Sequence, residues 1–224
     1  MARIAHHLSH RKRAAGQVVQ KLIELYPKPR CALEYRNAYE LLVATILSAQ
    51  CTDVRVNLVT PNLFARYPDP QALAAAQVSD VEALIQSTGF FRAKAKNLVS
   101  MAGQLVILHH GEVPANLDGL TRLPGVGRKT AHVVLGNAFG LTSGIVVDTH
   151  VKRLSYRLGL TKLADPVSIE HELTVLVPQG EWINFSHRLI EHGRTVCDAR
   201  RPRCETCKLS EFCPKEGVIR KANP

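Results

Sequence analysis

Four cysteines near the end of the chain are the residues best suited to bind a metal. Cys197, Cys204, Cys207 and Cys213 are separated by six, two and five residues within a seventeen-residue window. Four thiols so close in sequence predict one shared metal centre. Structural zinc usually takes two closely spaced pairs, and only Cys204 with Cys207 forms such a pair. The spacing therefore favours an iron–sulfur cluster, with structural zinc as the alternative.

A glycine-rich segment between two helical patterns could bind a phosphate. Residues 123–131 read Leu-Pro-Gly-Val-Gly-Arg-Lys-Thr-Ala, and a helix is expected over 130–139. We expect Gly125 and Gly127 to allow a tight turn with positive φ, after which the helix presents unpaired N–H groups. Such groups bind anions without reading base sequence, which suits a nucleic-acid phosphate. A plain turn between two helices is the alternative.

Lys129 and Asp148 could act together on a sugar. Lys129 lies in the first turn of the expected helix, where the helix terminus and nearby cations disfavour an ammonium and so favour a nucleophilic amine. The alternative is a lysine that pairs with phosphate. Asp148 follows nineteen residues later, directly before another expected helix, so it is a good N-cap. A carboxylate there could also stabilise the positive charge that develops at a sugar C1′.

The composition indicates an intracellular globular protein with polyanionic partners. The chain has 224 residues, of which 46% are hydrophobic and 21% charged, enough for two modest domains. Lys and Arg number 29 against 19 Asp and Glu, a net charge of +10 that favours nucleic acid or an anionic membrane. No apolar run is long enough to span a bilayer. The basic start, residues 1–13, has no apolar stretch behind it, so no secretory signal is expected.

Helical signals dominate the sequence. Apolar residues recur at helical spacing over 18–23, 42–47 and 98–106, and period-2 alternation is scarce. Aromatic residues make up only 5% of the chain, which leaves little material for a sheet. We expect an all-α fold of about ten helices. Three helix starts are indicated by two capping boxes and one proline at the first helical position: Asn37 with Glu40, Ser79 with Glu82, and Asp165 with Pro166.

Three features together resemble one known family. The chain resembles the endonuclease III family of helix-hairpin-helix DNA glycosylases in three motifs that follow one another in the family's order. They are segment 123–131, the Val-Asp-Thr-His segment 147–150, and the Cys-x6-Cys-x2-Cys-x5-Cys ending. The resemblance covers about residues 17–215. It implies two helical domains flanking a DNA-binding cleft. Residues 31–141 would form a six-helix domain ending in the helix-hairpin-helix, and 1–30 with 142–224 a cluster domain.

The resemblance also implies a reaction. The family combines a DNA glycosylase and an abasic-site lyase, which remove oxidised pyrimidines from duplex DNA in base excision repair. Lys129 would attack C1′, expel the base and hold the sugar as a Schiff base before β-elimination. Asp148 would activate the lysine or stabilise the sugar cation, and the four cysteines would hold a 4Fe-4S cluster. The target nucleotide must leave the base stack for this chemistry.

Further DNA contacts follow from the same resemblance. Gln50, in segment 47–53, would fill the hole left by the extruded base, and Phe90, in segment 88–92, would wedge into the duplex opposite the lesion. Family members carry an aliphatic residue at the position of Phe90, and an aromatic ring could stack on the orphan base. His150 would orient Asp148 or contact the DNA backbone. The hairpin would contribute Pro124, Gly125, Val126, Gly127, Arg128 and Thr130. A polar helix end for Gln50 and a core position for Phe90 are the alternatives.

Two other functions compete with this interpretation. An adenine-mismatch glycosylase shares the hairpin and the cluster, but that relative generally lacks a lysine such as Lys129. It also usually carries an extra C-terminal domain, for which we expect no room in a chain that ends at Pro224. A non-catalytic DNA-binding or redox-sensing module would not need Lys129 together with Asp148. We therefore expect an enzyme that acts as a monomer on damaged double-stranded DNA, in the cytoplasm or nucleoid and away from membranes.

Overall fold

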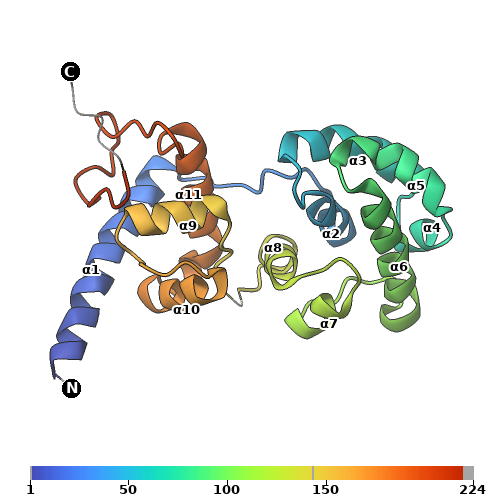
Figure 1. The fold of residues 1–224 in the computed structure, drawn as a ribbon. Helices are drawn as coiled ribbons and strands as arrows, with labels where there is room; N and C mark the ends of the chain where they lie inside the picture. Colours follow the sequence, from blue (N-terminus) through green and yellow to red (C-terminus); the bar gives the residue numbers. More distant parts are fainter. Residues whose placement is uncertain (1, 143, 219–224) are drawn as a thin grey trace. The chain divides into compact units, whose positions relative to one another are not determined.

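Helices form all the regular secondary structure in the described part of the chain. The computed structural model describes residues 2–142 and 144–218, which fold into eleven α-helices and two short 3-10 helices without a strand (Figure 1). The predicted all-α fold is confirmed. Among these described residues, no helix is long and apolar enough to cross a membrane.

The chain divides into two compact units. One comprises Cys31–Ser143, and the other joins Met1–Arg30 to Gly144–Pro224. These bounds lie close to those expected from the family resemblance. The second unit is discontinuous because its first helix packs with the helices that follow residue 144.

The unit Cys31–Ser143 is built around helix α2 (Ala38–Leu47), of which residues 39–47 are all buried. Helices α6 and α8 both pack against α2, and α6 also packs against α4 and α5. The unit has seven α-helices where the resemblance implied six, and α4 is only five residues long. The remaining elements of the unit are α3 (Asp53–Arg66), α4 (Pro70–Ala74), α5 (Val78–Ile85), η1 (Gln86–Thr88), α6 (Phe91–His109), α7 (Leu117–Arg122) and α8 (Arg128–Phe139).

The other unit has its own core. Phe185 and Leu189 are fully buried there with Leu22. Helix α1 contacts α10 and α11, and α9 contacts α11. The elements of this unit are α1 (Ala2–Leu25), α9 (Thr149–Arg157), α10 (Pro166–Leu176), η2 (Gln179–Glu181) and α11 (Trp182–Thr195). Residues 196–218 form turns and loops without a further helix.

Two of the three predicted helix starts are confirmed. Asn37 caps α2 by accepting the Glu40 N–H at 2.9 Å. The Glu40 carboxylate does not return to the Asn37 N–H, as a full capping box would require. It accepts the N–H and the guanidinium of Arg36 instead. Asp165 caps α10 with Pro166 in the first turn.

The third predicted start is wrong. Helix α5 begins at Val78, after the N-cap Gln77, whose side chain makes no capping hydrogen bond. Ser79 is therefore already inside the helix and does not cap it. The first residue of α5, Val78, packs against the core of the unit, and burial of an apolar side chain outweighs the roughly 1 kcal/mol that a good cap contributes.

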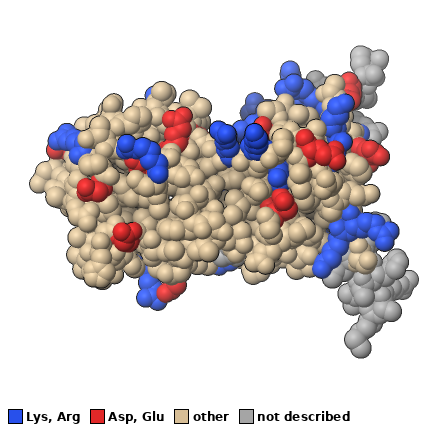
Figure 2. Space-filling model, turned by 180° about the vertical axis from the view of Figure 1, so that it is seen from behind, with Lys and Arg blue, Asp and Glu red and all other residues tan. Residues whose placement is uncertain are grey.

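Charged side chains are distributed over the surface. On the face in Figure 2, Lys and Arg form several separate groups with Asp and Glu among them. The net charge of +10 is thus not gathered into one patch on this face. The net charge favours nucleic acid as a partner. The surface that contacts the nucleic acid has to be identified from individual residues.

Candidate functional site

The predicted hairpin joins α7 to α8 through residues 123–127. Gly125 has φ +77°, and a Cβ at this position would lie 3.1 Å from the Cβ of Asn97 on α6. Gly127 is the N-cap of α8 with φ −86°, so the prediction of a positive φ at both glycines is wrong for Gly127. A Cβ on Gly127 would meet nothing within 4 Å. The protein itself therefore requires glycine at 125, whereas Gly127 leaves open space in front of the helix.

The start of α8 offers an anion site and an amine. The helix begins at Arg128, two residues earlier than predicted, so Lys129 is its second residue and is exposed. The N–H groups of a first helical turn have no acceptor within the helix. Val126 is buried in the core of the unit and fixes the turn from inside, while Pro124 and Thr130 are half-buried on either side of it.

Asp148 occupies the predicted N-cap position of α9. Its Oδ1 accepts the N–H of Val151 at 2.8 Å, and its side chain is half-buried. His187 on α11 interacts electrostatically with Asp148. Burial lowers the pKa of His187, and the nearby carboxylate partly offsets this. Nothing in the sequence singled out His187. Lys129 and Asp148 belong to different compact units, and each is positioned by its own unit.

His150 is held between α9 and α11. Its Nδ1 lies 3.1 Å from an Nη of Arg153, and a Cβ on Gly193 would approach that Nδ1 to 2.6 Å. Gly193 thus allows α11 to lie close to the imidazole. The expected role of His150 in orienting Asp148 or contacting DNA stays a prediction.

Gln50 and Phe90 share an unusual backbone conformation. Gln50 follows α2 with φ 53°, and Phe90 precedes α6 with φ 46°. A left-handed backbone is uncommon for residues other than glycine and is often found at functional sites. Gln50 is exposed and Phe90 is 67% exposed. A core position for Phe90 is therefore wrong, and it is Phe91 that packs against the core.

A buried lysine near these loops was missed by the sequence analysis. Lys94 on α6 is only 5% exposed, and its Nζ donates to the Leu47 carbonyl at 2.7 Å and to the Thr88 carbonyl at 2.8 Å. Burial lowers the pKa of this ammonium. The available signal was its register, because Lys94 lies one helical turn before Leu98 on the buried face of α6.

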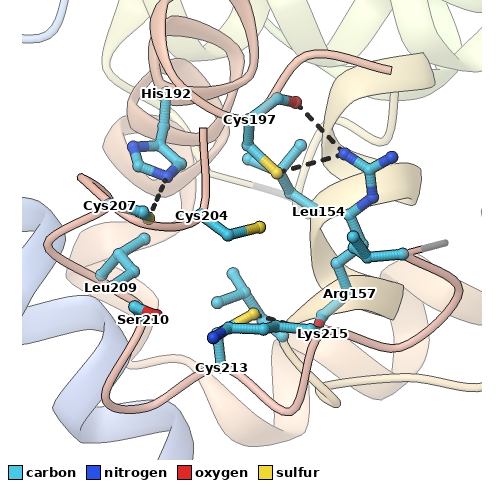
Figure 3. A pocket seen from close by; sticks show the side chains of 12 residues that line it. Leu154, Arg157, His192, Cys197, Cys204, Cys207, Leu209, Ser210, Cys213 and Lys215 are labelled. Atoms are coloured by element: carbon cyan, nitrogen blue, oxygen red, sulfur yellow. Dashed lines mark hydrogen bonds between the residues drawn. The ribbon is translucent and has the colours of Figure 1, made fainter. Parts of the chain in front are cut away.

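The four predicted metal ligands line one pocket (Figure 3). The sulfurs of Cys197, Cys204 and Cys213 face a common space in this view. The pocket is completed by side chains from α9, α11 and the C-terminal loops, including Leu154, Arg157, His192, Leu209 and Lys215. Among residues 2–142 and 144–218, no group of three His, Cys, Asp or Glu side chains forms a ligand set for a single metal ion.

Arg157 fastens the cysteine loop to α9. It is 7% exposed, and its guanidinium donates to the carbonyls of Asp198 and Ala199 at 2.7 and 2.8 Å. The same group lies 3.3 Å from the sulfur of Cys197. Arg157 thereby holds the loop that carries Cys197 and directs one N–H group at its sulfur.

His192 approaches the pocket from α11. Burial lowers its pKa to about 4, so the ring is neutral at physiological pH. Its Nδ1 lies 2.8 Å from the Tyr26 hydroxyl and its Nε2 3.4 Å from the Cys207 sulfur. When Tyr26 donates to Nδ1, the neutral ring carries its proton on Nε2 and donates to sulfur.

Two thiols of this pocket, those of Cys207 and Cys213, resist ionisation on their own. Burial is the main cause that raises the pKa values of Cys207 and Cys213, and the neighbouring cysteines raise them further. Four thiolates lining one pocket need a compensating positive charge, which a metal centre supplies. The residues present therefore fit a cluster held by cysteines.

Comparison with known proteins defines the class. Residues 43–179 match the family model of the HhH-GPD superfamily of base excision DNA repair proteins. This range includes the hairpin, Lys129 and Asp148.

Relatives at higher identity narrow the class. Endonuclease III of Synechocystis sp. is 53% identical over 214 residues, 96% of this chain and 98% of that protein, and endonuclease III of Escherichia coli is 39% identical over 90% and 96%. A non-covalent endonuclease III–DNA complex is similar with a TM-score of 0.86 and 40% identity, covering 91% of this chain and 95% of the other. A trapped endonuclease III–DNA covalent intermediate matches equally well, with the same TM-score and identity.

The chain belongs to the endonuclease III family. It is thereby one of the bifunctional base excision repair enzymes, which are both DNA glycosylases and abasic-site lyases. Membership in this family excludes the two alternatives, a non-catalytic module and a monofunctional adenine-mismatch glycosylase.

The two hairpin glycines give a matched pair of variants. Gly125→Ala should destabilise the protein by about 1–2 kcal/mol, because alanine disfavours the left-handed backbone and its methyl meets Asn97. Gly127→Ala should change stability by less than about 0.5 kcal/mol but weaken binding to abasic-site duplex, since its methyl projects into the open space. Urea denaturation and fluorescence anisotropy measure the two effects. Normal DNA binding by Gly127→Ala would contradict an anion site at this turn.

Proposed function

We propose that this chain removes oxidised pyrimidines from duplex DNA and then cleaves the strand at the abasic site, with Lys129 as the nucleophile. The observation that carries this proposal is the exposed Lys129 amine in the first turn of α8, directly after Gly127 and its open space. The trapped covalent complex of a protein 40% identical to this chain supports a covalent mechanism.

The reaction balances with this chain's own residues. The free amine of Lys129 attacks C1′ of the damaged nucleotide, and the bond from C1′ to the base breaks. The base leaves with the bonding electron pair and takes up a proton. The C1′–O4′ bond then breaks with its electron pair on O4′, which takes up one proton that the Lys129 nitrogen gives up. A protonated Schiff base with one hydrogen on nitrogen remains, and its positive charge makes the C2′ proton easier to remove. Removal of a C2′ proton expels the 3′ phosphate, and water later releases the sugar remnant from Lys129.

Asp148 supplies the carboxylate for this sequence. It can take the proton that converts the Lys129 ammonium to an amine, or stabilise positive charge on the sugar as the base departs. Because Oδ1 is engaged at the N-cap, the position of the carboxylate is fixed by the start of α9.

The DNA contacts assign separate roles to exposed residues. The N–H groups at the start of α8 bind a phosphate with Arg128 beside them, while Gln50 fills the space of the extruded base and Phe90 stacks against the base opposite. Exposure and left-handed backbone at both positions support these roles. The partner is damaged double-stranded DNA, which the protein binds as a monomer inside the cell.

We assign a 4Fe-4S cluster to the cysteine pocket. Cys197, Cys204, Cys207 and Cys213 would hold it, with Arg157 beside the sulfur of Cys197. When bound, the cluster supplies a structural centre that ties the C-terminal loops to α9 and α11. With all four positions taken by thiolates it offers no site to substrate, so no step of the reaction passes through it.

Replacing the nucleophile should separate chemistry from binding. Lys129→Gln should lower single-turnover base release by on the order of 10³-fold or more and abolish borohydride trapping. Its affinity for DNA should fall only as expected for one lost charge. Lys162→Gln, an exposed lysine outside the site, is the matched control. Equal loss of binding and catalysis in Lys129→Gln would show that Lys129 serves only to pair with phosphate.

Asp148 offers a test in which capping and catalysis are separable. Asn caps helices about as well as Asp, so Asp148→Asn should keep the free energy of unfolding within about 0.5 kcal/mol. Base release should fall by roughly 10²–10⁴-fold, since the charge and the basic oxygen are lost. Denaturation and single-turnover kinetics on the same sample measure both. Wild-type kinetics in Asp148→Asn would leave Asp148 a cap only.

The metal centre has a direct spectroscopic test. Protein purified without oxygen should be brown, absorb near roughly 400 nm and contain about four irons per chain, as thiolate-bound iron–sulfur clusters do. Cys204→Ala should lose the absorption band and lower the stability of the protein, because the loops lose their common anchor. A colourless protein with one zinc per chain would contradict the assignment.

A further inference from the structure

Helix α6 contacts all three segments to which the proposed function assigns DNA contacts. Lys94, on its first turn, hydrogen bonds to carbonyls of the segments before Gln50 and before Phe90. Asn97, one turn further along the helix, lies against Gly125 in the hairpin. All these residues belong to the unit Cys31–Ser143, so their arrangement is set inside one compact body.

The first hydrogen bond fixes the turn that carries Gln50. Leu47 is the last residue of α2. The last carbonyls of a helix receive no hydrogen bond from an N–H group of the same helix. The Lys94 ammonium satisfies the Leu47 carbonyl at 2.7 Å, and a cation is favourable at this end of a helix. Gln50 follows three residues later in its left-handed conformation.

The second hydrogen bond fixes the loop that carries Phe90. The Lys94 ammonium donates to the Thr88 carbonyl at 2.8 Å, and the backbone N–H of Lys94 donates to the Phe90 carbonyl at 3.1 Å. Thr88 is itself buried, with its hydroxyl bonded to the Ile85 carbonyl. The exposed Phe90 ring is thus carried by a backbone that is held on both sides of Gly89.

Lys94 is oriented away from any role as a nucleophile. Its side chain is buried, and its ammonium is directed at two carbonyls of its own chain. Burial of a cation is costly unless hydrogen bonds compensate for the lost water. A methionine of similar length could fill the same space without that cost, so the two hydrogen bonds are the distinctive contribution of lysine here.

We propose that Lys94 is a positioning residue that ties the Gln50 turn to the Phe90 loop, so that both side chains enter the duplex in a fixed relation. The inference rests on the proposed function, because it assumes that Gln50 and Phe90 act on the two sides of the extruded nucleotide. Misplacement of positioned groups by about 1 Å can cost on the order of 100-fold in rate. Lys94 acts through these two residues and does not touch the reacting atoms.

The test compares two substrates. Lys94→Met keeps the length and apolar stem but removes both hydrogen bonds. Base release from a thymine glycol duplex should fall roughly 10- to 100-fold, whereas cleavage of an abasic single strand, which has no opposite base and no hole to fill, should stay within about twofold of wild type. Lys96→Met, the same change at an exposed position of α6, should leave both rates unchanged. An equal loss on both substrates would overturn the proposal.

A conservative variant guards against simple misfolding. Lys94→Arg retains a cation with several donors and should fold, with a smaller loss that is again confined to the duplex. If Lys94→Met does not fold, the proposal is tested with Lys94→Arg. The quantity compared is then the rate on the thymine glycol duplex divided by the rate on the abasic single strand. A ratio equal to that of wild type, with a lowered rate on both substrates, would mean that Lys94 only supports the core.

A double-variant cycle separates this inference from the proposed function. In a Gln50→Ala/Phe90→Ala background, Lys94→Met should have almost no further effect on duplex, because the groups it positions are gone. If the background variant itself retains wild-type duplex activity, the roles proposed for Gln50 and Phe90 fail. If the background variant is impaired but Lys94→Met keeps its full effect in it, only the role of Lys94 fails.

Discussion

The turn before helix α8 is the constraint on which the candidate site depends. The chain can reverse there only because Gly125 takes a left-handed backbone and lets Asn97 of α6 come close. The buried Val126 then locks the turn to the core. The result is a helix start whose first-turn N–H groups have no acceptor within the helix, with an exposed lysine in that turn. The anion site and the nucleophile that we propose would both be produced by the same few residues.

Helix starts carry the two side chains to which we assign the reaction, one in each compact unit. Lys129 is the second residue of α8 in one unit, and Asp148 is the N-cap of α9 in the other. A helix start fixes backbone and side chain together, so each group is placed by the stable core beneath it. In the second unit the same helix α9 also carries Arg157, which fastens the cysteine loop. The cysteine pocket and the Asp148 cap are thereby parts of one packed unit.

The sequence predicted the features that local chemistry determines. The helical class and the caps at Asn37, Asp148 and Asp165 follow from patterns within a few residues, and the structure has them. Ser79 is not a cap because α5 already includes Val78, which packs against the core of the unit. The prediction of a positive φ at Gly127 rests on residue type alone, and nothing within the protein requires glycine there, since a Cβ would meet no atom within 4 Å.

Residues that act through tertiary contacts could not be found in this way. Lys94 joins carbonyls that are 47 and 6 residues away in the sequence, and His187 meets Asp148 only once α9 and α11 are packed. A lysine on an apolar helix face is a signal of such a role. Its acceptors are backbone carbonyls, however, which every residue type carries, so the sequence does not reveal which ones they are. The family resemblance supplied Gln50 and Phe90, and the structure adds their shared backbone conformation.

The most direct test of the account is the site of covalent attachment. The protein is incubated with one duplex that carries thymine glycol and one that carries a preformed abasic site, borohydride reduces any imine, and the digested protein is mapped by mass spectrometry. The account predicts the same sugar remnant on Lys129 with both duplexes. An adduct on another amine, or base release from thymine glycol without any adduct, would contradict Lys129 as the nucleophile.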